Sequence, residues 1–234
     1  MVYSFLMFIL VRNAVQYALL ALLYQLAQSG ASGGLVDLLI LRDETGAYNG
    51  YSGDVSSIIA ALGFIGGALA VWSTAKLLIT KNKEDMHLSH LKKEGKAKYA
   101  LLVAVTIGAV IGFNLLFELL GVTNKSEAYT EVASQQYSAH FMVGILVFGF
   151  ISPIAEELLF RGVIYGYLRR FMDIKLAIAL SALIFGVYHM NYVQGIYGFL
   201  IGCLMAYAYE YFGEFKMAVF VHVASNVLAY CLSY

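Results

Sequence analysis

The sequence predicts an all-α membrane protein, a polytopic bundle of about seven transmembrane helices. Of its 234 residues, 61% are hydrophobic and only 13% are charged, a composition typical of proteins that fold in lipid bilayers. Seven apolar stretches are long enough to cross a hydrocarbon core of about 30 Å, which takes about 17 to 25 residues of helix. Each must be helical, because unpaired backbone groups are too costly in lipid and no alternating barrel pattern is present.

The stretches follow one another closely, so we expect a single membrane domain over residues 1–234. They run over Tyr3–Ala27, Ser57–Thr80, Tyr99–Leu120, Ala139–Leu168, Ile174–Met190, Tyr192–Phe212 and Met217–Ser233. Residues 1–120 hold the N-terminal helices, and residues 139–234 hold the helices that carry polar motifs. No basic segment precedes the first stretch, which we therefore expect to be a retained helix rather than a signal peptide.

The charge of the loops predicts the orientation in the cell membrane. One set of alternate connections holds ten Lys and Arg residues, and the other set holds two. The ten are Lys81, Lys83, Lys92, Lys93, Lys96, Lys98, Arg169, Arg170, Lys175 and Lys216, and the two are Arg42 and Lys125. Because basic loops stay in the cytoplasm, we expect a cytoplasmic N-terminus and an outside C-terminus.

Composition also excludes several function classes. Lys plus Arg and Asp plus Glu balance at 15 each, so no overall field attracts nucleic acid. There is no zinc-finger spacing and no glycine-rich phosphate loop, which argues against nucleotide-driven function. Both cysteines, Cys203 and Cys231, fall in apolar stretches, where we expect them to pack as core residues.

The fourth stretch contains adjacent carboxylates, and ionisable residues inside spanning helices tend to mark function. Glu157 and Arg161 are spaced i, i+4, as for an ion pair on one helix face. Neighbouring residues point about 100° apart, so Glu156 faces elsewhere without a counter-charge and is the candidate base or ligand. The plainer alternative is that Arg161 and packing neutralise both acids. Pro153 predicts a kink, which either opens room beside the site or only serves packing.

Two later stretches carry polar pairs at helical spacing. Phe185 and His189 share one face of the fifth stretch, and His222 and Asn226 share one face of the seventh. A lone histidine in a helix is most often a satisfied core residue. Three polar clusters that converge on one bundle make a functional site the better interpretation.

Together these residues form three motifs on three separate helices. They are Glu156-Glu157-x-x-x-Arg161, Phe185-x-x-x-His189 and His222-x-x-x-Asn226. This ordered set resembles the CPBP family, the CAAX proteases and bacteriocin-processing (Abi-type) intramembrane peptidases. The resemblance covers about the C-terminal 95 residues, whereas the N-terminal helices are similar only in being hydrophobic.

The resemblance implies a catalytic division of labour. Glu156 and His189 would bind and activate the attacking water, while His222 and Asn226 would stabilise the oxyanion of the tetrahedral intermediate. Hydrolysis needs both a base and donors aimed at the developing charge, so this agrees with the interpretation of the residues themselves. The supporting role falls to Glu157 and Arg161.

The resemblance leaves open whether a metal takes part in the reaction, since the family has been described both as metalloprotease-like and as a metal-independent glutamate peptidase. Glu156, His189 and His222 would supply three ligands for a zinc with an open position. If His222 is an oxyanion donor, however, only two ligands remain, too few for a stable zinc site. We expect a metal-free mechanism without a cofactor, with zinc as the alternative.

Straight helices do not bring these residues to one depth. Glu156 and His189 each lie 14 residues from the basic residues that end their helices, about 21 Å at 1.5 Å per residue. His222 lies only six residues from Lys216, about 9 Å. Either residues 213–216 dip into the membrane or the fourth and fifth helices tilt or start deeper, and we predict the former.

The function predicted is an intramembrane endopeptidase acting on a small membrane-associated, leader-bearing or prenylated peptide, in a water-filled chamber reached from the cytoplasmic side. Its expected partners are that peptide or protein substrate and the lipid bilayer, without nucleic acid. One alternative is a transporter or proton relay, although a relay would spread its ionisable residues along a route. Another is a non-catalytic immunity or binding protein. Peptide maturation, CAAX processing and immunity remain open as roles, as does the oligomeric state.

Overall fold

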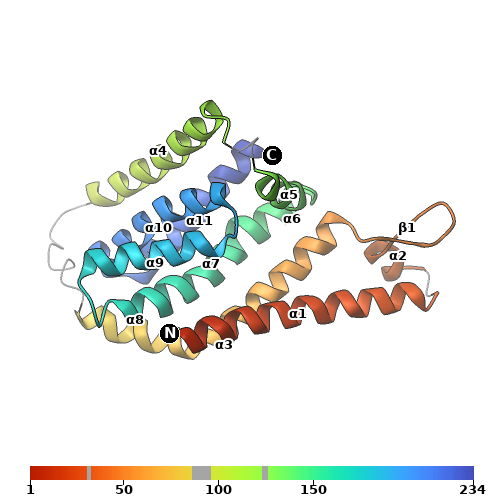
Figure 1. Ribbon diagram of the computed structural model, residues 1–234, viewed down its shortest axis with the longest axis horizontal. Helices are drawn as coiled ribbons and strands as arrows, with labels where there is room; N and C mark the ends of the chain where they lie inside the picture. The colour runs from red at the N-terminus through yellow and green to blue at the C-terminus, as the bar shows by residue number, and fades with distance from the viewer. Residues whose placement is uncertain (31–32, 86–95, 123–125) are drawn as a thin grey trace.

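The computed structural model describes residues 1–30, 33–85, 96–122 and 126–234 (Figure 1). It is an all-α bundle, as the sequence predicts. Among the residues described, six helices are long and apolar enough to cross a membrane, and a shorter apolar helix accompanies them. The protein is therefore a multi-pass membrane protein of about seven helices.

The observed helix bounds agree closely with the apolar stretches. The long helices are α1 (Val2–Gln28), α3 (Gly53–Asp85), α4 (Ala97–Leu119), α10 (Tyr192–Phe212) and α11 (Phe215–Ser233), and the shorter apolar one is α9 (Ile174–Tyr188). Asp173 caps α9 and Asn191 caps α10 through side-chain oxygens that accept backbone N–H bonds. Gly213 ends α10 in the left-handed conformation that glycine adopts without strain.

The fourth spanning helix is continuous but not uniform. It consists of α6 (Phe141–Gly144), the π-helical stretch η3 (Ile145–Ile151), α7 (Ser152–Glu157), the π-helical stretch η4 (Leu158–Tyr165) and α8 (Gly166–Leu168). π-Helical turns are rare and occur frequently at functional sites. Here they flank the segment that carries Glu156 and Glu157, and η3 ends two residues before Pro153.

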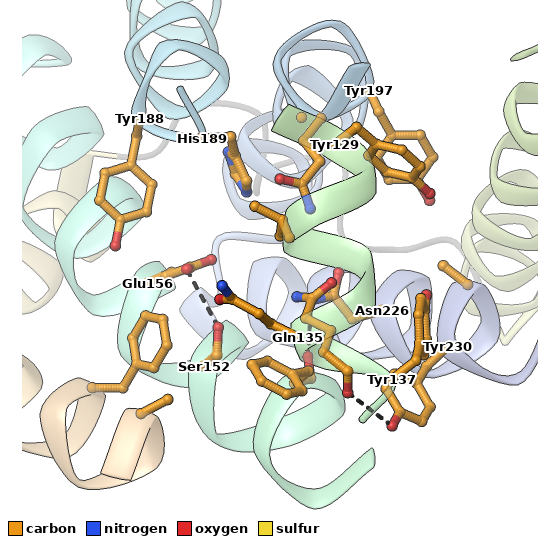
Figure 2. Close-up of a pocket in the computed structure, with 18 of the residues that line it drawn as sticks. Tyr129, Gln135, Tyr137, Ser152, Glu156, Tyr188, His189, Tyr197, Asn226 and Tyr230 are labelled. Atoms are coloured by element: carbon orange, nitrogen blue, oxygen red, sulfur yellow. Dashed lines mark hydrogen bonds between the residues drawn. The ribbon is translucent and has the colours of Figure 1, made fainter. Parts of the chain in front are cut away.

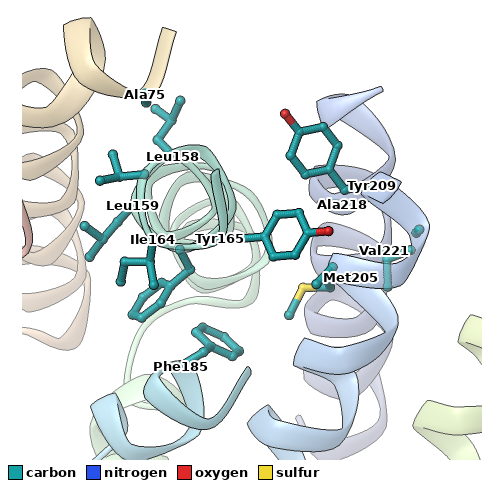
Figure 3. Close-up of a cluster of buried hydrophobic side chains, with 14 of the residues drawn as sticks. Ala75, Leu158, Leu159, Ile164, Tyr165, Phe185, Met205, Tyr209, Ala218 and Val221 are labelled. Carbon is teal, nitrogen blue, oxygen red and sulfur yellow. The ribbon is translucent and has the colours of Figure 1, made fainter. Parts of the chain in front are cut away.

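This helix occupies the centre of the bundle, and η4 is its most buried part. All eight residues of η4 are buried. Figure 3 shows its apolar side chains, among them Leu159 and Ile164, surrounded by residues of four other helices. Those neighbours are Ala75 of α3, Phe185 of α9, Met205 and Tyr209 of α10, and Ala218 and Val221 of α11. The candidate carboxylates thus belong to the best-packed element of the molecule.

Glycines let α9 and α10 approach closely, as small residues do in membrane bundles. A Cβ added to Gly186 would lie 2.5 Å from the carbonyl oxygen of Gly195, so neither backbone leaves room for a side chain there. One and two turns further along α10, Gly198 and Gly202 face α9. This contact fixes where the end of α9 meets the interior.

The basic helix ends gather at one end of the bundle (Figure 1). There the Asn82 amide of α3 donates to the Gly166 carbonyl at 2.8 Å, and Arg169 pairs with the fully buried Glu210 at 3.0 Å. Lys98 lies 5.5 Å from the Phe212 ring centroid. Of the residues that predict the orientation, Lys92, Lys93 and Lys125 lie outside the described part of the chain. The opposite end carries few basic residues in the sequence.

Three features of the connections were not predicted. Residues 29–56, between the first two apolar stretches, hold the short helix α2 (Leu35–Leu39) and an antiparallel pair, β1 (Leu41–Arg42) and β2 (Tyr48–Gly50). The helix α5 (Glu127–Gln136) lies between α4 and α6 and begins at Ser126, whose hydroxyl accepts from the Tyr129 N–H. α5 is amphipathic and too short to span, so a search for apolar stretches misses it.

Candidate active site

The three motifs converge on one cavity of about 570 Å³ (Figure 2). Glu156 of α7, His189 at the end of α9, and His222 and Asn226 of α11 all line it. Glu157 and Arg161 do not line it and lie fully buried behind it. The structure thus brings all six predicted site residues together, with the division between cavity and support that the helix spacing indicates.

Glu157 is the centre of the buried support. Its Oε1 accepts a hydrogen bond from Nη1 of Arg161 at 2.7 Å, the i, i+4 ion pair that the sequence predicts. The same oxygen lies 2.9 Å from Nδ1 of His222. Arg161 also donates from Nη2 to the Gly202 carbonyl at 2.9 Å. Glu157 therefore orients a histidine as well as neutralising an arginine, a role that spacing alone did not reveal.

Glu156 faces the cavity, and no arginine pairs with it among the residues described. Ser152, one turn earlier, donates from its hydroxyl to Oε1 at 3.3 Å. Oε2 lies 3.7 Å from Nε2 of His222. The residue is 5% exposed, so the atoms that reach its carboxylate do so from the cavity. Such a group is suited to exchange a proton with a molecule held there.

His189 stands where α9 stops. Its backbone is the C-cap of the helix, and Met190 follows in the left-handed region with φ 58°. Nδ1 lies 2.9 Å from the Phe185 carbonyl, which leaves Nε2 directed to the cavity. The Asn191 amide donates to the His189 carbonyl at 3.1 Å and closes the turn. Because α9 ends at this point, the His189 imidazole lies at the cavity in the interior of the bundle.

Phe185 is the common neighbour of the polar groups. Its ring centroid lies 4.8 Å from that of His189 and 5.3 Å from that of His222, both edge-on. The guanidinium carbon of Arg161 lies 4.7 Å from the same centroid, a cation–π distance. The phenylalanine of the second motif therefore fixes the spacing between the two histidines.

Asn226 presents its amide to the cavity beside the other groups (Figure 2). Nδ2 donates to the Phe148 carbonyl at 3.0 Å, which uses one of its two hydrogens. The second hydrogen is left for a ligand. Asn226 and His222 lie one turn apart on α11, so both can donate a hydrogen bond to the same atom of that ligand.

Among the residues described, no three His, Cys, Asp or Glu side chains are grouped so that they could hold a metal ion. Nδ1 of His222 is engaged by Glu157, which leaves only its Nε2 free to act as a ligand beside Glu156. The expectation of a metal-free reaction stays a prediction.

The cavity runs away from the basic end of the bundle. Its far wall includes Tyr51, Tyr129 and Gln135 of the opposite end, together with Ser233 near the C-terminus. Gln135 and Ser233 are exposed, so the cavity reaches the surface there. Burial raises the pKa of the Tyr129 hydroxyl. The residues of α5 and the start of α3 line this open end. Entry of the substrate from the cytoplasmic side stays a prediction.

The structure brings the fourth and last helices together at the site, and π-helical geometry accounts for part of the difference in depth. Glu157 and His222 are in hydrogen-bond contact, and η4 lies between Glu157 and the basic end. A π turn holds more residues than an α turn, so the chain advances less than 1.5 Å per residue along η4. That shortens the distance assigned to the fourth helix. The dip of residues 213–216 into the membrane stays a prediction.

Sequence reasoning missed or set aside several residues around the cavity. Ser152 and Tyr188 gave no signal beyond ordinary helix composition, although Ser152 lies one turn before Glu156. Arg12 is a cation in an apolar stretch, and its Nη1 donates to the Tyr188 hydroxyl, a contact that no spacing in the sequence indicates. Glu210 is an acid inside a spanning helix, and this position could have predicted that it needs a partner such as Arg169.

Comparison with known proteins bears on the C-terminal half. Residues 138–228 match the family model described as type II CAAX prenyl endopeptidase Rce1-like. The match contains all three motifs, and it leaves α1, α3, α4 and α5 outside. No curated protein and no solved structure gives a significant match to the chain. The resemblance that the three motifs carry is confirmed.

Proposed function

Since residues 138–228 match the family model of Rce1-like type II CAAX prenyl endopeptidases, we propose that this membrane protein hydrolyses a peptide bond of a small membrane-associated, leader-bearing or prenylated peptide. The observation that carries the proposal is the position of Glu156. It is a buried carboxylate on the cavity wall, without an arginine of its own among the residues described, and His222 lies 3.7 Å away.

In the proposed reaction Glu156 and His189 hold a water molecule, and Glu156 takes its proton. The hydroxide attacks the carbonyl carbon of the peptide, and the carbonyl oxygen becomes an oxyanion. His222 and Asn226 donate hydrogen bonds to that oxyanion. Glu156 then returns its proton to the leaving nitrogen as the carbon–nitrogen bond breaks, which restores the carboxylate.

The contacts of His222 support an oxyanion role. Nδ1 lies 2.9 Å from Oε1 of Glu157, so Nε2 is turned towards the cavity, 3.7 Å from Oε2 of Glu156. A ring nitrogen held in this way is a fixed donor for the negative charge that develops on the substrate oxygen.

The arrangement favours chemistry over a proton relay. Acids and histidines gather at the inner end of the cavity, whereas the wall towards the opposite end is made of amides and phenols such as Gln135, Gln136 and Tyr129. These groups do not continue a chain of carboxylates or imidazoles to the surface. A local cluster at a closed end is suited to hold and activate one water molecule.

Replacing Glu156 with Gln tests the function directly. The purified protein, reconstituted in liposomes, is assayed with candidate peptides, and Glu156→Gln should lower kcat by about 10²- to 10⁴-fold, the usual contribution of general acid–base catalysis. Glu118→Gln is the control, because Glu118 is an exposed acid of α4 that does not line the cavity. Undiminished cleavage by Glu156→Gln would remove Glu156 from the reaction.

A further inference from the structure

Arg12 of α1 lines the same cavity, although it lies outside the segment that matches the family. Its Nη1 donates to the hydroxyl of Tyr188, and its Cζ lies 4.2 Å from the centroid of the Phe64 ring. Gln16 and Leu20 line the cavity at one and two turns along the same face of α1. The first helix thus contributes a wall of the cavity as well as a span.

Arg12, which is half-buried, differs from Arg161 and Arg169 in its counter-charge. Arg161 pairs with Glu157, and Arg169 pairs with Glu210. Within the described part of the chain, no Asp or Glu forms an ion pair with Arg12, and its Nε is buried without a hydrogen-bond partner. A guanidinium without a carboxylate is costly in an apolar bundle. An anion that enters the cavity would offset that cost.

Tyr188 connects Arg12 to the reacting groups. The Cζ atom of Arg12 lies 5.7 Å from the Tyr188 ring centroid, and that centroid lies 5.7 Å from the ring centroid of His189. Figure 2 shows Tyr188 and His189 on the side of the cavity that Glu156 faces. An extended residue spans about 3.3–3.6 Å. A group bound by Arg12 therefore lies within a few residues of the bond that Glu156 would attack.

We propose that Arg12 binds a carboxylate of the peptide substrate and thereby selects which peptides are held for cleavage. The inference rests on the proposed function and adds a specificity residue to it. A guanidinium matches a carboxylate with two parallel hydrogen bonds. A lipid headgroup is a poorer match, because Arg12 lies ten residues into α1, about 15 Å from its start, and faces the cavity.

Two sources supply such a carboxylate, the free C-terminus of the peptide and an Asp or Glu side chain near the cleaved bond. Matched fluorogenic peptides separate them. One pair contains no Asp or Glu and ends in a carboxylate or an amide, and the second pair ends in an amide and carries Glu or Gln on the leaving side. Full-length protein in liposomes should favour the carboxylate member of one pair roughly tenfold or more in kcat/KM, as for a charge-assisted hydrogen bond.

Variants of Arg12 decide whether it is the receptor. Arg12→Gln should abolish the preference, chiefly by raising KM for the carboxylate peptide while the amide peptide is unaffected. Arg12→Lys should keep part of the preference, because it keeps the charge but loses the paired donors. Arg170→Gln is the matched control, since Arg170 is exposed at the basic end and does not line the cavity.

Equal cleavage of both members of each pair by the unaltered protein would overturn the proposal. An equal loss for carboxylate and amide peptides in Arg12→Gln would do the same and indicate a structural arginine. Failure of the proposed function would give a different result. Either no peptide would be cleaved, or the Glu156→Gln protein would still cleave. In that case binding of the same peptides to the Glu156→Gln protein still tests Arg12, which should favour the carboxylate members and lose that preference in the double variant.

Discussion

Nδ1 of His222 lies 2.9 Å from Oε1 of Glu157, and this contact joins the last helix to the fourth inside the bundle. The same oxygen accepts from Arg161 at 2.7 Å. One carboxylate oxygen therefore holds an imidazole and a guanidinium, and the imidazole turns its other nitrogen towards Glu156. The second glutamate of the first motif thus positions the histidine of the third.

Glu157→Gln separates this positioning role from simple support. The amide retains an acceptor but loses the negative charge that holds both His222 and Arg161, so kcat per folded molecule should fall about 10- to 100-fold, as when outer partners of functional histidines are removed. KM should change little. Steady-state kinetics on the folded, monodisperse fraction measure both constants. Full kcat in that fraction, with only the yield lowered, would show that Glu157 serves only as the ion-pair partner of Arg161.

Gly202→Ala tests how tightly Arg161 is held. An added Cβ would lie 3.0 Å from Nη2 of Arg161 and 3.2 Å from Cβ of Ala182, so the overpacking should lower the free energy of unfolding by about 1–3 kcal/mol. Gly108→Ala is the control, because a Cβ there meets nothing within 4 Å and alanine favours the helix. Thermal unfolding in detergent compares the two. Equal stability of both variants would show that Arg161 has room to move.

Chelation tests the metal-free expectation. Cleavage by protein treated with a strong chelator should equal that of untreated protein, since no group of three metal-binding side chains is present among the residues described and Nδ1 of His222 is engaged by Glu157. Activity is assayed before and after addition of zinc. Complete loss on chelation, restored by zinc, would assign Glu156, His189 and His222 to a metal site instead.

The direction of the cavity predicts which side of the membrane the substrate enters. With the basic end in the cytoplasm, the end lined by Gln135 and Ser233 faces outside. In intact cells, and in a protein without Cys203 and Cys231, a membrane-impermeant thiol reagent should label Gln135→Cys at once. Lys175→Cys at the basic end should react only after permeabilisation. The reverse pattern would place the mouth of the cavity in the cytoplasm.

Much of the fold and the set of site residues could be predicted because each left a strong local signal. A run of about twenty apolar residues has few alternatives to a spanning helix, and acids such as Glu156 stand out within it. The i, i+4 spacing also separated Glu157 with Arg161 from Glu156 correctly. These inferences need only the period of a helix and the cost of charge in lipid.

Other features depend on tertiary contacts that have no local signature. The bond between Glu157 and His222 joins residues far apart in the sequence, and the position of Arg12 depends on how α1 packs against α3 and α9. The amphipathic helix α5 is too polar to register as a span, yet Tyr129 and Gln135 from it line the open end of the cavity. The open end of the cavity therefore could not be located from the sequence, whereas the residues of its inner end could.

The two π-helical stretches around Glu156 and Glu157 bear on how such a site can originate. An i→i+5 turn accommodates one residue more than an α turn, so each stretch is equivalent to a single-residue insertion in a plain spanning helix. Removing that residue would leave a helix that still crosses the bilayer, but the remainder of the helix would be rotated by about 100°. Single-residue insertions are thus enough to convert a plain membrane anchor into a helix that directs two acids at different neighbours.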